Sequence, residues 1–172
     1  MALSLATVKA ALRLDYTEDD AELSRLILAA EAWVENYCGI RLASATRTMS
    51  LLAWRRTAFA EYPYSSVTSV TYTDTADVVQ TLTAGSDYWV DTTQPMACIE
   101  FTVAPALKVG TLITVTYVAG YAAYPNEVAQ AVISLVGLWY SNPEAAQPTA
   151  LSSVPLGGQF MLEHLRVKGP FR

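Results

Sequence analysis

The most pronounced pattern of apolar and polar positions lies between Pro125 and Asn142. Its polar positions fall on one narrow line at helical spacing: Glu127, Gln130, Ser134, Gly137 and Ser141. Large apolar side chains fill the remaining surface: Val128, Val132, Ile133, Leu135, Val136, Leu138, Trp139 and Tyr140. Proline suits the first turn of a helix, and Asn142 precedes Pro143, which disfavours helical backbone there. The pattern therefore predicts a central helix that several partners bury, among which copies of the same chain are candidates.

Two more helices are predicted near the start of the chain. Ser4 is a suitable cap for a short helix that runs to about Leu14. The next helix has its apolar residues at i, i+3, i+4 and i+7 spacing: Leu23, Leu26, Ile27, Ala30, Val34 and Tyr37. Thr17 and Asp20 resemble a capping box at its start. Gly39 followed by Ile40 predicts a Schellman-type end.

From residue 45 to residue 118 the apolar period changes from 3.6 to 2, which predicts an antiparallel β unit. The expected strands cover residues 67–72, 78–82, 88–90, 98–101 and 111–118. The first two form a hairpin, the next two form a second pair, and the last strand places Ile113, Val115 and Tyr117 on one face. Residues 46–61 fit either an edge strand or an exposed arm around Arg55 and Arg56.

The order of these elements predicts an α+β fold: a small helical bundle with an inserted antiparallel β domain and an extended C-terminal arm. We place the N-terminal helices of the bundle in residues 1–44, the β insertion in 45–120 and the central helix in 121–143. Residues 144–172 form the linker and the arm, because Pro, Ala, Ser and Gly dominate up to residue 158. Residues 159–167 carry the spacing of a short amphipathic helix.

Composition narrows the functional classes. The chain of 172 residues is 52% apolar and 16% charged, which is typical of a folded protein. A net charge of −5 argues against nonspecific nucleic-acid binding. Neither a signal peptide nor a membrane-spanning segment is expected, which favours assembly in a cytoplasm. Cys38 and Cys98 lack metal-ligand spacing, and two buried thiols are favoured over a disulfide.

No catalytic constellation stands out, and we expect no enzymatic activity, no cofactor and no metal. The lone His164 has no partner at a motif spacing. The acids at residues 15–20 lack the alternating ligands of a calcium loop and fit a solvated helix start better. Asp87, Asp91 and Glu100 would have to meet in one cleft to act as paired acids, and nothing in the sequence brings them together.

Three segments, taken in order, resemble the phage head–tail connector proteins of long-tailed phages and gene-transfer particles. Residues 7–42 read TVKAALRLDYTEDDAELSRLILAAEAWVENYCGIRL, and residues 113–142 read ITVTYVAGYAAYPNEVAQAVISLVGLWYSN. Residues 66–91, SVTSVTYTDTADVVQTLTAGSDYWVD, are similar to the β insertion of one branch of that family. The C-terminal arm departs from the family pattern, because Phe171-Arg172 ends the chain where the family often closes on Tyr-Arg.

The resemblance implies a structural virion protein at the head–tail interface, in a ring of about twelve subunits around the DNA channel. The implied partners are the portal protein, neighbouring copies, and a tail-side stopper or tail-completion protein. DNA would pass through without specific binding, and no membrane is involved. The expected interface residues are Trp54, Arg55, Arg56, Trp89, Trp139, Tyr140, Phe160, Leu162, Leu165, Arg166 and Phe171.

The alternative function is a monomeric binding module. In it, the β domain holds a sugar or peptide on an aromatic surface formed by Tyr88, Trp89, Tyr117, Tyr121 and Tyr124. Core or interface packing is the commoner use of such residues. Tight ligand binding that is lost in a Trp89→Ala variant would favour this alternative.

Overall fold

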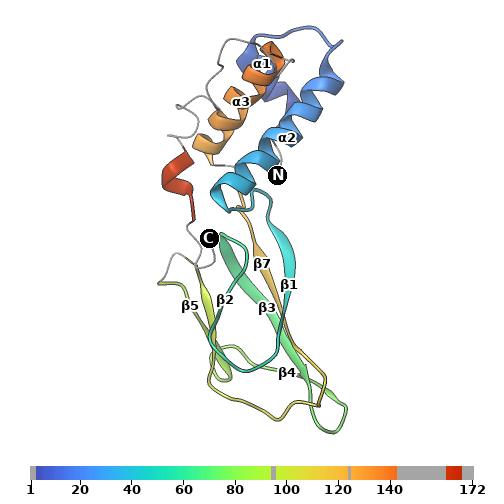
Figure 1. Ribbon diagram of the computed structural model, residues 1–172, viewed down its shortest axis with the longest axis vertical. Coiled ribbons are helices and arrows are strands. Elements are labelled where there is room, and N and C mark those ends of the chain that lie inside the picture. Colours follow the sequence, from blue (N-terminus) through green and yellow to red (C-terminus); the bar gives the residue numbers. More distant parts are fainter. Residues whose placement is uncertain (1–2, 94–95, 124, 143–161, 168–172) are drawn as a thin grey trace, which may run out of the picture. The chain divides into compact units, whose positions relative to one another are not determined.

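The computed structural model describes residues 3–93, 96–123, 125–142 and 162–167 (Figure 1). They divide into two compact units, each described here by itself. One is Ser44–Gly120, and the other contains the described residues before and after it. The predicted α+β class is confirmed, since the first unit consists of antiparallel strands and the second of helices. Of the predicted linker and arm at 144–172, only residues 162–167 lie within the described residues.

The helical unit contains α1 (Leu5–Leu12), α2 (Asp20–Cys38), α3 (Asn126–Ser141) and a short 3₁₀ turn, η1 (Glu163–Leu165). Helices α2 and α3 run antiparallel. At one end the Tyr140 hydroxyl donates to the Asp19 carboxylate, and at the other the Tyr121 N–H donates to the Arg41 carbonyl oxygen at 3.2 Å. The predicted central helix is confirmed, with Pro125 and Asn142 as its two flanking caps.

Burial along α3 follows the predicted pattern. The buried residues are Val128, Ala131, Val132, Leu135 and Val136, and the predicted polar positions Glu127, Gln130, Ser134 and Ser141 are exposed. Gly137 is the exception on the polar line, because an added Cβ would lie 3.0 Å from the Leu12 side chain of α1. Glycine therefore lets α1 pack closely against α3. Ile133, Leu138 and Trp139 remain only half-buried.

The end of α2 has the predicted Schellman geometry. Gly39 has a φ of +70°, and the Ile40 N–H donates to the Glu35 carbonyl oxygen at 3.2 Å. A left-handed backbone is strained for a residue with a Cβ, because that atom crowds the following carbonyl oxygen.

We expect Gly39→Ala to lower the free energy of unfolding by about 1 kcal/mol. Urea denaturation of the two proteins would measure the difference. A Gly→Ala change at an unstrained position usually stabilises a protein, so an unchanged or higher stability would contradict the assigned geometry.

The β unit contains two antiparallel sheets. Strand order is β1-β7-β3-β4 in the first and β2-β6-β5 in the second. The strands are β1 (Ala45–Leu51), β2 (Thr57–Ala58), β3 (Tyr64–Thr73), β4 (Val79–Thr81), β5 (Tyr88–Asp91), β6 (Cys98–Phe101) and β7 (Ile113–Ala119). Both predicted strand pairs are confirmed, as β3 pairs with β4 and β5 with β6. The ambiguous stretch after residue 45 begins with an edge strand, β1.

The inner faces of the two sheets share one hydrophobic core. Ile113, Val115 and Tyr117 are buried along β7, as the alternation predicted. The Phe59 ring packs between Tyr64 and Tyr117, with ring centroids 4.8 and 4.7 Å away. Because these rings come from separate segments of the chain, the core ties both sheets together.

The two cysteines are free thiols. Cys38 is buried, whereas Cys98 is only partly buried, so the prediction of two buried thiols is right for the first and overstated for the second. Within the described ranges, none of the helices combines the length and the apolar character that a membrane crossing requires.

Candidate interaction site

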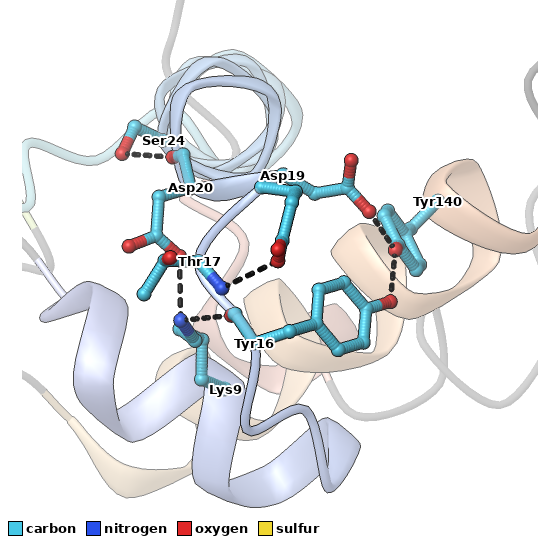
Figure 2. Close-up of polar contacts among 8 residues, drawn as sticks. Lys9, Tyr16, Thr17, Asp19, Asp20, Ser24 and Tyr140 are labelled. Atoms are coloured by element: carbon cyan, nitrogen blue, oxygen red, sulfur yellow. Dashed lines mark hydrogen bonds and ion pairs between the residues drawn. The ribbon is translucent and has the colours of Figure 1, made fainter.

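A polar network joins all three helices at one end of the helical unit (Figure 2). The Lys9 ammonium lies 2.6 Å from the Asp20 carboxylate and donates to the Tyr16 carbonyl oxygen at 2.5 Å. The hydroxyls of Tyr16 and Tyr140 are 2.6 Å apart, and Tyr140 donates to Asp19 at 2.5 Å. The loop between α1 and α2 is thereby held against the last turn of α3.

The predicted capping box at the start of α2 is wrong. The helix begins at Asp20, and its N-cap residue, Asp19, makes no side-chain capping bond. The reason is that Asp20 pairs with Lys9 and Asp19 accepts from Tyr140, partners that no local spacing reveals. The carboxylates still lie at the positive end of the helix dipole, which favours them electrostatically.

Tyr140 is the residue on which this network converges. Its pKa is raised, first because its hydroxyl donates to Asp19, and further by its hydrogen bond with Tyr16. Loss of the proton would place a phenolate beside the Asp19 carboxylate. The network therefore favours neutral Tyr140, and its contribution to stability is complete below the ordinary tyrosine pKa of about 10 and falls as the pH rises above it.

We expect Tyr140→Phe to lower the midpoint of thermal unfolding at neutral pH by about 2–4 °C. The variant should also lose less stability than the wild type as the pH rises past about 10, because it has no phenol to ionise at this position. Melting curves across that range would test both points. Tyr72→Phe is the matched control, because that ring packs on Trp54 in the other unit. Equal alkaline behaviour of Tyr140→Phe and the wild type would contradict the assigned role.

The described C-terminal residues attach to the last turn of α2. The Val167 N–H donates to the Cys38 carbonyl oxygen at 2.8 Å, and the Tyr37 hydroxyl donates to Glu163 at 3.1 Å. Leu162 is fully buried, and the Arg166 guanidinium lies 5.2 Å from the centre of the Tyr37 ring. Residues 159–161 of the predicted short helix lie outside the described residues. Leu162 is helical, and residues 163–165 form the 3₁₀ turn η1.

A second cluster covers the outer face of the three-stranded sheet. Arg56 reaches two strands at once, with nitrogens 2.7 Å from Asp91 and 2.9 Å from Glu100. The hydroxyl and N–H of Thr93, and more weakly Arg56, hold the pKa of Asp91 below its usual range. Trp89 pairs with Glu100 across the strands and is 50% exposed. Two of the expected interface residues, Arg56 and Trp89, therefore lie on one face.

The three acids that the sequence offered as possible paired acids have other partners. Asp91 and Glu100 both bind Arg56, whereas the Asp87 carboxylate accepts from the Thr83 N–H at 2.7 Å and the Ser86 hydroxyl at 3.1 Å. A general acid needs a raised pKa, and the pKa of Asp91 is lowered. In the part of the chain that the structure describes, no three His, Cys, Asp or Glu residues gather in a way that would hold a metal ion.

The aromatic platform of the binding-module hypothesis does not form as predicted. Tyr88 and Tyr117 are 5% and 2% exposed, because their positions in the strands point into the core. Tyr124 lies outside the described residues. Tyr121 is half-buried and belongs to the helical unit. Among the described residues of the set, Trp89 is thus the exposed ring on the β strands, and the strands offer a sugar or peptide no surface built from several exposed rings.

The other expected interface residues are dispersed. Trp54 packs edge-on against Tyr72 and Phe101 and donates to the Pro105 carbonyl oxygen at 2.8 Å, while Arg55 is exposed. On the helical unit, Trp139 and Tyr140 lie half-buried near the end of α3, Leu165 is half-buried, and Arg166 is exposed. Phe160 and Phe171 lie outside the described residues. The sequence indicates Asp91 and Glu100 only as possible paired acids. Their pairing with Arg56 was not foreseen, because they lie on β5 and β6, much later in the chain.

Comparisons with known proteins agree with this architecture. The chain is similar to one in the neck of an empty gene transfer agent particle, computed with C6 symmetry (24% identity, 98% of this chain and 93% of that chain, TM-score 0.75). It is also similar to a chain in the virion of a native gene transfer agent particle, with 25% sequence identity and a TM-score of 0.76; the match covers 98% of this chain and 93% of that chain. A third match is a chain in the neck of a native gene transfer agent particle, computed with C12 symmetry. It has 24% sequence identity and a TM-score of 0.72, and the match covers 98% of this chain and 92% of that chain. A comparison with curated proteins found no match.

The fold and these matches define a structural protein of the head–tail region of a virion. The head completion protein family matches residues 2–155, and the chain belongs to that family. The resemblance to phage head–tail connectors is thereby confirmed, and the expected location at the head–tail interface agrees with the matches.

Proposed function

We propose that this protein is a non-enzymatic head–tail connector that forms a ring of about twelve copies and joins the portal to the tail-side proteins. The observation that carries the proposal is the family match over residues 2–155, together with a fold shared with chains of gene transfer agent necks and virions. The C6 and C12 symmetries of those necks support a ring of repeated subunits.

Each part of the chain has a role in this proposal. The helices of residues 1–44 and 121–143 pack side by side with neighbouring copies, for which half-buried Ile133, Leu138 and Trp139 supply apolar contact area. The β insertion of residues 45–120 meets a neighbour or the tail-side protein. Residues 144–172 bind the portal. A net charge of −5 lets DNA pass without adhering, because like charges repel.

The native mass of the purified protein, alone and mixed with its portal, tests the proposal. Light scattering after size exclusion should give a mass of about twelve subunits or co-elution with the portal. A monomer that also fails to bind the portal would contradict the connector function.

A further inference from the structure

The outer face of the four-stranded sheet carries no charged residue. The register places on it the residues that alternate with the buried ones: Thr46, Thr48, Ser50, Ser66, Ser69, Thr71, Thr73, Val79, Thr81, Thr114, Thr116 and Val118. Ten of these twelve are Ser or Thr, and the other two are Val. We name this surface the hydroxyl face.

The hydroxyl face continues into exposed apolar residues at the end of the sheet away from Ala45 and Ala119. Leu52 directly follows β1 and is 82% exposed, and Leu112 directly precedes β7 and is 43% exposed. Val79 of β4 is 66% exposed. Charged side chains on sheet edges and on protein surfaces discourage association with other chains. Depletion of charged residues is a feature of interface cores, and exposed apolar patches mark interaction sites.

The opposite side of the β unit presents a different surface. The two sheets share a core through their inner faces, so the outer face of the three-stranded sheet points away from the hydroxyl face. That surface, the Trp89 face, carries Trp89, 50% exposed, and Arg56, whose side chain is 52% exposed and held by Asp91 and Glu100. Exposed tryptophan and oriented arginine are the residue types that dominate binding energy at interfaces.

The two faces have complementary chemistry. Copies that each carry a net charge of −5 repel one another, and an uncharged face is where a neighbour can approach at least cost. The ion cluster of Arg56 loses water on contact, and buried charges need new hydrogen-bonding partners. Serine and threonine hydroxyls both donate and accept, so they can bind carboxylate and guanidinium alike. A purely apolar surface could not provide these hydrogen bonds.

We propose that the hydroxyl face of one copy docks on the Trp89 face of a second copy. Because the two faces are different and lie on opposite sides of the β unit, the contact is head-to-tail and repeats from copy to copy, as ring closure requires. The inference rests on the proposed ring and adds to it the two surfaces that meet.

Thr116→Lys tests the hydroxyl face, because Thr116 lies on the central strand between Thr48 and Ser69. The matched control is Thr75→Lys, which adds the same charge to the exposed β3–β4 turn, off that face. We expect Thr116→Lys and Trp89→Ala each to raise the protein concentration that is needed for ring assembly by about tenfold or more, with or without the portal. The control should assemble like the wild type. Unchanged thermal melts would show that each variant is folded.

Cross-linking gives a direct readout in the assembled ring. A Trp89→Cys chain and a Thr116→Cys chain, both with Cys98→Ser, are mixed, assembled at a concentration well above the one that Trp89→Ala requires, and treated with a short bis-maleimide. Mixed dimers in excess of those from either chain alone are expected. Normal ring formation by Thr116→Lys, or rings of the two cysteine chains that yield no excess of mixed dimers, would overturn the assignment of these faces while leaving the connector function intact. If no ring forms under any condition, with or without the portal, both proposals fail.

Discussion

Leu162→Ala is expected to lower the free energy of unfolding of the helical unit by about 2–4 kcal/mol, because the variant leaves a cavity at a fully buried site. If Leu162 belonged to an exposed arm, the same substitution would change stability little. A large effect would therefore show that Leu162 is part of the core of the helical unit. Chemical denaturation followed by helical circular dichroism would measure it. Leu28→Ala is the matched control, since Leu28 is 64% exposed on α2 and its loss should change stability little.

The Cys38 thiol provides a second readout of the same variant. Burial raises the pKa of Cys38 to about 11, so the reactive thiolate is scarce at neutral pH. The Val167 N–H donates to the Cys38 carbonyl oxygen, and Leu162 is buried beside it. Release of this segment should speed labelling of Cys38 by a maleimide by about tenfold or more at about pH 8. Labelling as slow as in the wild type would show that residues 162–167 do not protect α2.

Tyr117→Ala should have a comparable effect on the β unit and cost about 3–5 kcal/mol. Tyr117 is 2% exposed on the central strand β7 and packs against Phe59 at 4.7 Å. Its removal takes a large ring from the core that both sheets share, at a place where the backbone of β7 is fixed by pairing on both sides.

The neighbouring residue supplies the control for that experiment. Thr116 lies on the same strand with its side chain on the opposite face, so Thr116→Ala should change stability by no more than about 0.5 kcal/mol. Amide hydrogen exchange would show whether the lost protection is confined to β-unit amides. Similar costs for both variants would mean that the inner and outer faces of β7 are assigned wrongly.

Periodicity predicted the regular parts of the fold because each pattern repeats over a whole element. The apolar positions of α2 and α3 and the alternation along β7 depend on which residues share a face, and this follows from helix and strand geometry alone. The Schellman end at Gly39 was predictable for a similar reason, because a left-handed position favours glycine.

Contacts between distant segments could not be read in this way. Asp19 and Tyr140 meet across most of the sequence, and their hydrogen bond replaces the capping box that local spacing indicated. Arg56 likewise finds its carboxylates on β5 and β6, strands that follow much later in the chain. The sequence also does not reveal the uncharged hydroxyl face. Its residues belong to four strands and become neighbours only through the register of the sheet.

The pairing of Ala45 with Ala119 has a consequence for how the chain reaches its native state. Helices α2 and α3 are separated in sequence by the whole β unit, so their direct association would have to close a long flexible loop. Once β1 and β7 have paired, the segments that lead from Ala45 to α2 and from Ala119 to α3 begin side by side. Most of the entropy cost of closing the long loop has then already been offset by contacts within the sheet. Helix packing is then nearly local. The slow step of folding should therefore be the distant β1–β7 pairing, with the association of α2 and α3 following it.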